Sequence, residues 1–131
     1  MKIKFAAVFV GLALLLGAVP VFGHHSFDAE YDRQKQREFT GTVTKVEWMN
    51  PHARFYVDVV GEDGKVENWE FELGSPNGLM RRGWTRNSLK VGDKVTLVGN
   101  LAKDGSNLAN ARNVTLANGK KVFAGSSADG N

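Results

Sequence analysis

The sequence predicts an all-β domain with one short helix, and three observations support this class. Apolar and polar residues alternate at short range after Glu38, while a helical period of 3.6 residues is nearly absent. Pairs of turn-forming residues recur at short intervals: Asp63-Gly64, Asp104-Gly105 and Asn118-Gly119. The length of 131 residues, with 42% hydrophobic and 24% charged positions, suits one domain and excludes a large multidomain enzyme.

The N-terminus predicts a Sec-type signal peptide. Lys2 and Lys4 precede an apolar run over residues 5–16, and Pro20 stands shortly before a cleavage site expected after Gly23. We therefore expect a periplasmic or secreted protein. An uncleaved anchor is the alternative, but Pro20 interrupts the apolar run, so we expect no permanent membrane span.

Charge and cysteine content exclude several classes of protein. The chain has no cysteine, which excludes disulfides, thiolate metal sites and thiol nucleophiles. Of its 17 basic residues, Lys2 and Lys4 would leave with the signal peptide, so the mature chain would carry a net charge of +1 against 14 acidic residues. Because this net charge provides no excess of basic residues to bind phosphate groups, we expect no nucleic-acid partner.

The first expected strand covers residues 38–49 and changes phase midway. Its apolar side chains fall on two phases: Phe39 and Val43 on the first, Val46 and Trp48 on the second. A strict period of two cannot direct both pairs inward, so the pattern predicts a β-bulge near Thr44.

Two further strands are expected over residues 53–60 and 66–73, joined by the Asp63-Gly64 turn. Alternation separates their two faces. The residues expected to point inward are Ala53, Phe55, Val57, Val59, Trp69, Phe71 and Leu73. Glu70 and Glu72 are expected to point outward.

The pattern changes between residues 74 and 91, where a short helix is expected. Ser75 suits the N-cap, Pro76 suits the first helical position, and Gly83 ends the helix. Residues 85–89 are expected to add a second helical turn. The remaining strands are expected at residues 94–99, 108–116 and 121–123, the last two joined by the Asn118-Gly119 turn.

Three strands, a short helix and two strands form the order of the five-stranded OB barrel, with the last strand as an addition. A six-stranded sandwich is the alternative, but the phase switch in the first strand favours a strand that bends around a closed sheet. The chain would then divide into a signal peptide (1–23), an N-terminal arm (24–37), an OB-like β-barrel domain (38–123) and a flexible tail (124–131).

Three histidines are the candidates for a metal site: His24, His25 and His52. If cleavage bares His24, its amine and imidazole form a bidentate set. One further imidazole, from His25 or His52, would complete a three-nitrogen site suited to copper or another late transition metal. In the alternative interpretation, the first two histidines are solvated and His52 hydrogen-bonds its own loop.

Residues 48–54 join the first two strands, a connection that OB barrels use for ligands. The side chains expected to bind a small molecule here are Trp48, Asn50, His52 and Arg54. The alternative is structural, with Trp48 in the core and Arg54 paired across strands with an acid such as Glu70.

A basic stretch follows the expected helix: Arg81, Arg82, Arg86 and Lys90, close to Trp84. This stretch could hold an acidic small molecule, a phosphate or the carboxylates of an envelope protein, and Arg81 and Arg82 are its candidate ligand residues. Such docking, through this stretch or through strand edges, is the alternative function. Intramolecular pairing with the acids of residues 62–72, or a solvated face, would also explain the charges. No nucleophile elbow or paired-carboxylate motif predicts catalytic residues, so we expect no enzyme.

Four phrases of the sequence together resemble one family: HHSF (24–27), GTVTKVEWMNPHARFYVDV (41–59), NWEFELGSPNGLMRRGWTRNSLKVGDKVT (68–96) and KDGSNLANARNVTLANGKKVF (103–123). On these phrases the chain is similar to domain of unknown function 6152, a family of small exported bacterial proteins. The resemblance implies export and a single small β-barrel domain, and it implies no catalytic or binding residue.

Overall fold

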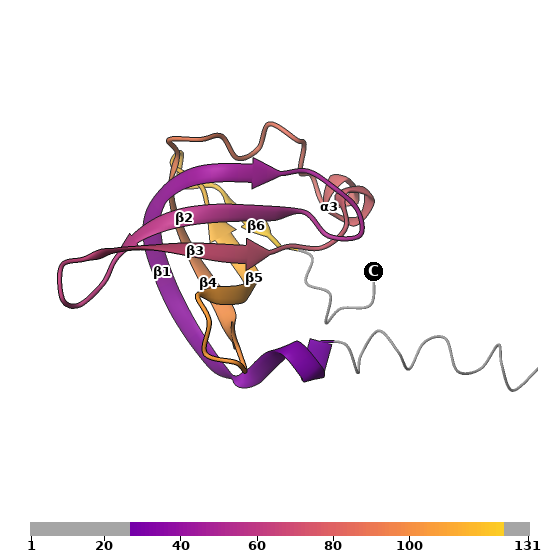
Figure 1. Ribbon diagram of the computed structural model, residues 1–131. Helices are drawn as coiled ribbons and strands as arrows, with labels where there is room; N and C mark the ends of the chain where they lie inside the picture. The colour runs from indigo at the N-terminus through magenta and orange to yellow at the C-terminus, as the bar shows by residue number, and fades with distance from the viewer. Residues whose placement is uncertain (1–26, 125–131) are drawn as a thin grey trace, which may run out of the picture.

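The structure, a computed structural model, describes residues 27–124 of the chain. A short helical turn at 27–30 precedes six strands and one helix (Figure 1). Their bounds are β1 Tyr31–Glu47, β2 Arg54–Val60, β3 Val66–Glu72, α3 Pro76–Arg81, β4 Lys94–Ala102, β5 Leu108–Thr115 and β6 Lys121–Phe123.

The first five strands close into a barrel, which confirms the expected OB-like fold and rules out the sandwich. Hydrogen-bonded neighbours follow the order β3-β2-β1-β4-β5-β6, and β3 also pairs with β5 in parallel. This last pairing joins Glu70 to Leu108 and Glu72 to Asn110, so the ring has no open side there. The sixth strand extends β5 through an antiparallel pairing, and α3 lies between β3 and β4 along the chain.

The long strand β1 bends around the barrel, as Figure 1 shows. Its pairing with β2 shifts between Val43 and Lys45, which confirms the β-bulge expected near Thr44. A Cβ atom on Gly41 would lie 2.1 Å from the Asp58 carbonyl oxygen, so only glycine fits where β1 passes β2.

β1 begins at Tyr31 rather than at residue 38, which corrects the boundary expected for the N-terminal arm. Residues 32–38 are polar and mostly exposed, so they carry no alternation that sequence could detect. Backbone pairing with β4, from Gln36 with Asn100 onwards, makes them a strand.

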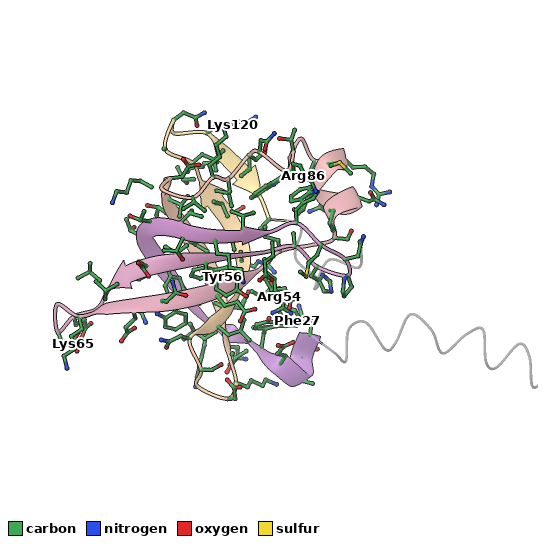
Figure 2. The ribbon with its side chains drawn as sticks, turned by 45° about the horizontal axis from the view of Figure 1, so that its top comes forward. Phe27, Arg54, Tyr56, Lys65, Arg86 and Lys120 are labelled. Carbon is green, nitrogen blue, oxygen red and sulfur yellow. The ribbon has the colours of Figure 1, made fainter. Side chains whose placement is uncertain are left out.

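The β2–β3 hairpin projects beyond the barrel with Lys65 near its tip (Figure 2). The Gly61 amide donates to the Lys65 carbonyl at 2.8 Å, and Gly64 has φ of 77°, which confirms the turn expected there. The tip lies away from α3, so it takes no part in the end of the barrel considered below.

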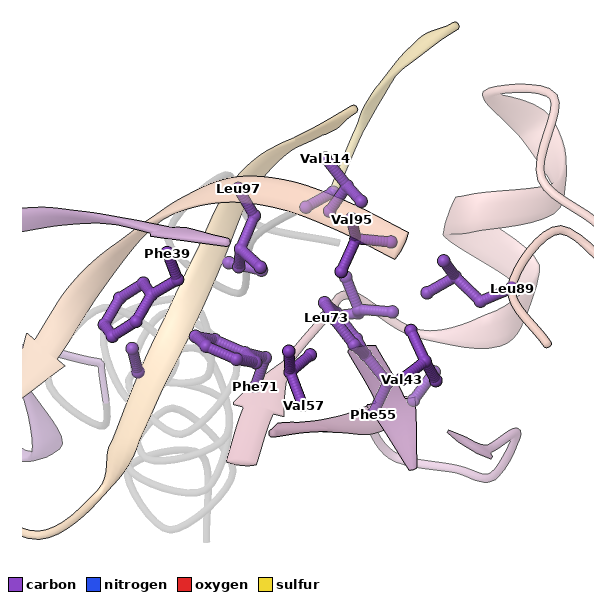
Figure 3. Close-up of a cluster of buried hydrophobic side chains, with 14 of the residues drawn as sticks. Phe39, Val43, Phe55, Val57, Phe71, Leu73, Leu89, Val95, Leu97 and Val114 are labelled. Atoms are coloured by element: carbon purple, nitrogen blue, oxygen red, sulfur yellow. The ribbon is translucent and has the colours of Figure 1, made fainter. Parts of the chain in front are cut away.

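The core fills the barrel with apolar side chains from every strand (Figure 3). All seven residues expected to point inward from β2, β3 and the residues flanking them are buried. The Phe71 ring lies 4.9 Å from that of Phe39 and 5.3 Å from that of Phe55, centroid to centroid. Figure 3 also shows Leu89, from the connection after α3, pointing into this cluster.

Two expectations near the chain's connections are wrong. Residues 85–89 form turns and not helix, because the Thr85 amide donates to Ser88 Oγ at 2.9 Å and side chains of this kind compete with helical bonding. Ala124, expected to start a flexible tail, is fully buried. Its amide donates a hydrogen bond to the Arg112 carbonyl, and its carbonyl accepts one from the Gly74 amide. Within residues 27–124, no helix is long and apolar enough to cross a membrane.

Candidate ligand site at one end of the barrel

Helix α3 and the residues after it build one wall of the site. Ser75 Oγ accepts a hydrogen bond from the Gly78 amide at 3.1 Å, which starts the helix as expected. Gly83, with φ of 94°, then turns the chain. The Trp84 amide donates to the Leu79 carbonyl at 3.0 Å, and its side chain is buried, so the indole is fixed against the barrel.

The residues between β1 and β2 build the opposite wall. Trp48 is half-buried and packs against the main core. The Ala53 amide donates to the Gly74 carbonyl at 3.0 Å, and the Leu73 amide donates to the Ala53 carbonyl at 2.8 Å. These bonds tie the connection to the residues that lead into α3, so the two walls face each other.

Between the walls lies a shallow hollow, open to solvent and too small to enclose a water molecule, which we call the barrel-end hollow. Its lining is Val46, Trp48, Ala53, Arg54, Leu73, Trp84, Thr85, Arg86 and Leu89. Most of these side chains are apolar, and the charges come from two guanidinium groups. An apolar surface with a few polar groups at defined positions is the usual composition of a small-ligand site.

Arg54, one of these two groups, also belongs to a hydrogen-bonded network on the outer face of the sheet. It forms an ion pair with Glu70, and its Nη2 lies 3.3 Å from Glu72 Oε2. Tyr31 Oη donates to the same Glu72 oxygen at 3.0 Å, and Tyr56 Oη donates to Glu70 Oε1 at 3.4 Å. The structural interpretation of Arg54 as the cross-strand partner of Glu70 is therefore confirmed.

Glu72 lies on the outer face of the sheet as expected, but its side chain is buried there. Its side chain is only 5% exposed, because Tyr31 covers the outer face of the sheet at this point. Burial, with the Glu72 charge next in size, raises the pKa of the Tyr31 hydroxyl far above its usual value. Burial, followed by the Glu72 charge, also raises the pKa of the Glu30 carboxyl.

The structure brings together only part of the predicted ligand set. Trp48 and Arg54 line the barrel-end hollow. His52 is partly buried and does not line the hollow, although the next residue, Ala53, does. The hollow's lining does not include Asn50, Arg81 or Arg82, which are exposed. Docking of an envelope protein on the basic stretch stays a prediction.

Arg86, from the basic stretch that was predicted to hold an acidic group, lines the hollow, and so do Trp84 and Leu89, which were not predicted to bind a ligand. The sequence signal was present, since Trp84 and Leu89 are apolar residues within a basic stretch. It was obscured by the helical turn expected there, which would have given these side chains a different spacing.

The metal hypothesis depends on residues that lie partly beyond the described chain. His24 and His25 fall outside residues 27–124, so their position relative to His52 is not described. Within residues 27–124, no group of three or more His, Asp or Glu side chains is arranged to hold a metal ion.

The closed five-stranded ring with a helix between its third and fourth strands defines an OB-like β-barrel protein. Residues 13–111 match the family described as "Family of unknown function (DUF6152)", and the chain belongs to this family. No curated protein matches the chain.

A solved structure with a similar barrel is the mitochondrial single-stranded DNA binding protein Rim1 from S. cerevisiae. It is 8% identical, the match covers 63% of this chain and 92% of that chain, and the TM-score is 0.49. That protein is named for binding single-stranded DNA, and the expectation of no nucleic-acid partner is withdrawn. At this identity the likeness concerns the fold alone.

Proposed function

We propose that the protein is an exported, non-enzymatic binding module that holds a small molecule in the barrel-end hollow. One observation carries the proposal: Trp48 and Trp84, from two separate connections, line one hollow together with the guanidinium of Arg86. Trp84 is buried, so the half-buried ring of Trp48 supplies the rigid apolar surface, and the exposed guanidinium donates hydrogen bonds but transfers no proton at neutral pH. Such a lining favours binding over catalysis.

The size of the hollow limits the ligand. It is open to solvent and too shallow to enclose a water molecule, whereas sites for drug-sized molecules enclose roughly 300–1,000 Å³. The ligand therefore rests against the exposed part of the lining and stays largely in solvent.

The three tryptophans provide a direct test, with one of them as an internal control. The ¹⁵N-labelled chain starting at His24 is titrated with phenylacetate and 2-phenylethanol, and the indole N–H signals are followed by NMR. We expect the Trp48 and Trp84 signals to shift with a Kd of about 1 mM. The Trp69 signal stays in place, because Trp69 does not line the hollow.

A pair of variants checks that the shifts report binding in the hollow. Trp48→Ala removes part of one wall and should abolish the shift of the Trp84 signal. Met49→Ala alters the next residue, which is 49% exposed and does not line the hollow, and should leave binding unchanged. If neither compound moves the Trp48 or Trp84 signal in the unaltered chain, the proposed function is wrong.

Copper is the second candidate ligand, and the environment of His52 favours it. The Nδ1 atom of His52 is buried and has no hydrogen-bond partner among residues 27–124. Tyr31 is bonded to Glu72, and Glu72 to Arg54, which follows His52 by two residues in the chain. His24 precedes Phe27 by three residues, a length of chain that spans about 10 Å when extended.

Calorimetric titration with copper(II) tests this second candidate. The chain starting at His24 should bind one ion with a Kd below about 10 µM, and both His24→Ala and His52→Ala should weaken binding. A chain with one additional residue before His24 is the control, since it keeps all imidazoles but moves the terminal amine. Weaker binding, or binding indifferent to His52→Ala, would exclude the shared site.

A further inference from the structure

We infer that residues 27–35, which we call the β1 arm, exchange between two copies of this chain, so that each arm binds to the barrel of the other copy. The β1 arm lies at the start of β1, beside the end of β4 and the turn that follows it (Figure 1). The inference goes beyond the proposed function, because the β1 arm and the barrel-end hollow share no residue. Three features carry it: how the β1 arm is held, what lies beneath it, and how it joins the rest of β1.

The β1 arm is held by a small apolar cluster that is separate from the main core. Phe27, Tyr31 and Ala102 are its buried members, and Leu108 packs against them. The rings of Phe27 and Tyr31 lie 5.3 Å apart, centroid to centroid. None of these four side chains belongs to the main core cluster. The β1 arm can therefore leave without opening the interior of the barrel.

The barrel also binds main-chain carbonyl groups of the β1 arm. The Lys103 amide donates to the Glu30 carbonyl at 2.8 Å. Asn100 Nδ2 donates to the carbonyl oxygens of Asp32 and Arg33, at 3.2 Å and 3.3 Å. Main-chain hydrogen bonds combined with pockets for a few side chains are the usual means by which a sheet binds a separate peptide segment. The surface under the β1 arm is thus a peptide-binding site that the chain itself fills.

A row of buried polar side chains lies beneath the β1 arm. Glu72 on β3 is the direct neighbour of Asn110 on β5, which in turn neighbours Asn100 on β4. Within residues 27–124, no other polar or charged side chain is buried. The β1 arm covers both ends of the row, because Tyr31 Oη donates to Glu72 Oε2 at 3.0 Å and Asn100 donates to the arm carbonyls.

This polar row makes the covered state less stable than an apolar row would. Asn100 Oδ1 is buried and has no hydrogen-bond partner in the described part of the chain. A buried polar atom without a partner costs free energy, and water satisfies it once the covering segment leaves. The composition of the row therefore lowers the cost of releasing the β1 arm.

The β1 arm joins the rest of β1 through surplus residues. From Tyr31 to Gln36, β1 advances by five residues, whereas β4 advances by two from Ala102 to Asn100, so three residues of β1 are surplus. Residues 33–36 are exposed. When this irregular stretch is extended, the three residues add about 10 Å of reach. The β1 arm can then contact a neighbouring barrel while β1 stays paired from Gln36 onwards.

A second copy of the chain is the partner because the site is already complementary to this particular segment. An exchanged arm forms the same contacts with the other barrel as with its own, and two exchanged arms give a closed, symmetric dimer. Exchange must compete with the local concentration of an arm near its own barrel, which is in the millimolar range for a short tether. We therefore expect the unaltered chain to dimerise with a Kd of about 1 mM.

Two variants that each keep one half of the contact test the exchange. Phe27→Ser with Tyr31→Ser disables the arm and leaves the site empty, whereas Ala102→Glu blocks the site and leaves the arm intact. The ¹⁵N-labelled arm variant is titrated with the unlabelled site variant, and the amide signals of Lys103 and Leu108 are followed by NMR. We expect both signals to move towards their positions in the unaltered chain, with a Kd of about 0.1 mM. Binding is tighter than for the unaltered chain because no arm competes within either molecule.

Each variant alone is the control and should stay monomeric in sedimentation velocity, while the mixture forms a dimer. Urea unfolding verifies that both barrels are folded. A third variant needs neither of the others: Asn100→Ala removes the donor to the Asp32 and Arg33 carbonyls and should raise the dimer fraction of the otherwise unaltered chain about twofold.

Two results would overturn the inference. The first is a mixture in which the Lys103 and Leu108 signals stay in place, together with an Asn100→Ala chain that dimerises no more than the unaltered one. The second is a dimer that persists in either variant alone, since such a dimer would form through another surface. Neither result bears on ligand binding in the barrel-end hollow.

Discussion

Arg54 and Arg86 line the same hollow but belong to two different kinds of protein surface. Around Arg54, the carboxylates of Glu70 and Glu72 and the hydroxyl of Tyr31 form a network in which each charged group has a partner. Around Arg86, the side chain is exposed within a basic segment. The same functional group is therefore held by the fold's own carboxylates in one place and exposed to solvent in the other.

The comparison teaches that charge content alone does not identify a binding residue. Arg54 was a predicted ligand residue because it follows a loop that OB barrels use, yet its charge is satisfied by its own sheet. What distinguishes the two guanidinium groups is the position of acidic residues in three dimensions. Three predictions test this contrast, the first expected to have the largest effect.

The same substitution at the two arginines should have very different effects on stability. Arg54→Met leaves Glu72 buried without its cationic partner and should lower the free energy of unfolding by about 3 kcal/mol. Arg86→Met alters an exposed side chain and should change it by no more than about 0.5 kcal/mol. Urea unfolding followed by tryptophan fluorescence measures both. Equal losses at the two positions would contradict the comparison.

The network around Arg54 should also depend on the hydroxyl that covers it. Tyr31→Phe removes the hydrogen bond to Glu72 Oε2 and should lower the free energy of unfolding by about 2 kcal/mol, since the acceptor is a buried carboxylate. Tyr56→Phe is the matched control. Its hydroxyl lies 3.4 Å from the more exposed Glu70, so the loss should be clearly smaller. A larger loss at Tyr56 would show that Tyr31 contributes packing only.

The smallest effect concerns Glu30, whose carboxyl has a pKa raised by burial and by the Glu72 charge. The charged groups that act on it are Glu72, Arg54, Glu70 and Asp104. Because folding favours the protonated form, this carboxyl lowers stability as the pH rises through its ordinary pKa to its raised value, and the loss then persists at neutral pH.

Glu30→Gln should therefore stabilise the protein at pH 7 and leave it unchanged at pH 3, where the carboxyl is neutral in both states. Thermal unfolding of the two chains at a series of pH values measures the difference. A stabilisation that is the same at pH 3 and pH 7 would have a cause other than the charge.

Most of the barrel was predictable because its strands are buried on one face only. The alternation through Phe55 and Val57 reports this burial directly, and the phase change around Thr44 reports the bend that closes the ring. The helix was predictable for a local reason, since the Ser75 side chain caps it within three residues.

The start of β1 and the binding surface were less predictable because they depend on contacts between distant segments. Tyr31 and Glu72 are 41 positions apart, and no local pattern indicates that one covers the other. The hollow likewise needs Trp48 and Trp84 to meet across the barrel end. The sequence indicated that tryptophan and arginine side chains are suited to binding. Which of these side chains line one hollow is determined only when the barrel closes.

Closure of the barrel depends on segments from the second half of the described chain. The Gly74 amide donates to the Ala124 carbonyl, and the Ala124 amide donates to the Arg112 carbonyl, at 3.0 Å and 2.9 Å. The parallel seam between β3 and β5 likewise needs residues 108–110. A polypeptide delivered from its N-terminus must therefore emerge at least as far as residue 110 before the ring can close. Until then, only the open sheet of β3, β2, β1 and β4 can form.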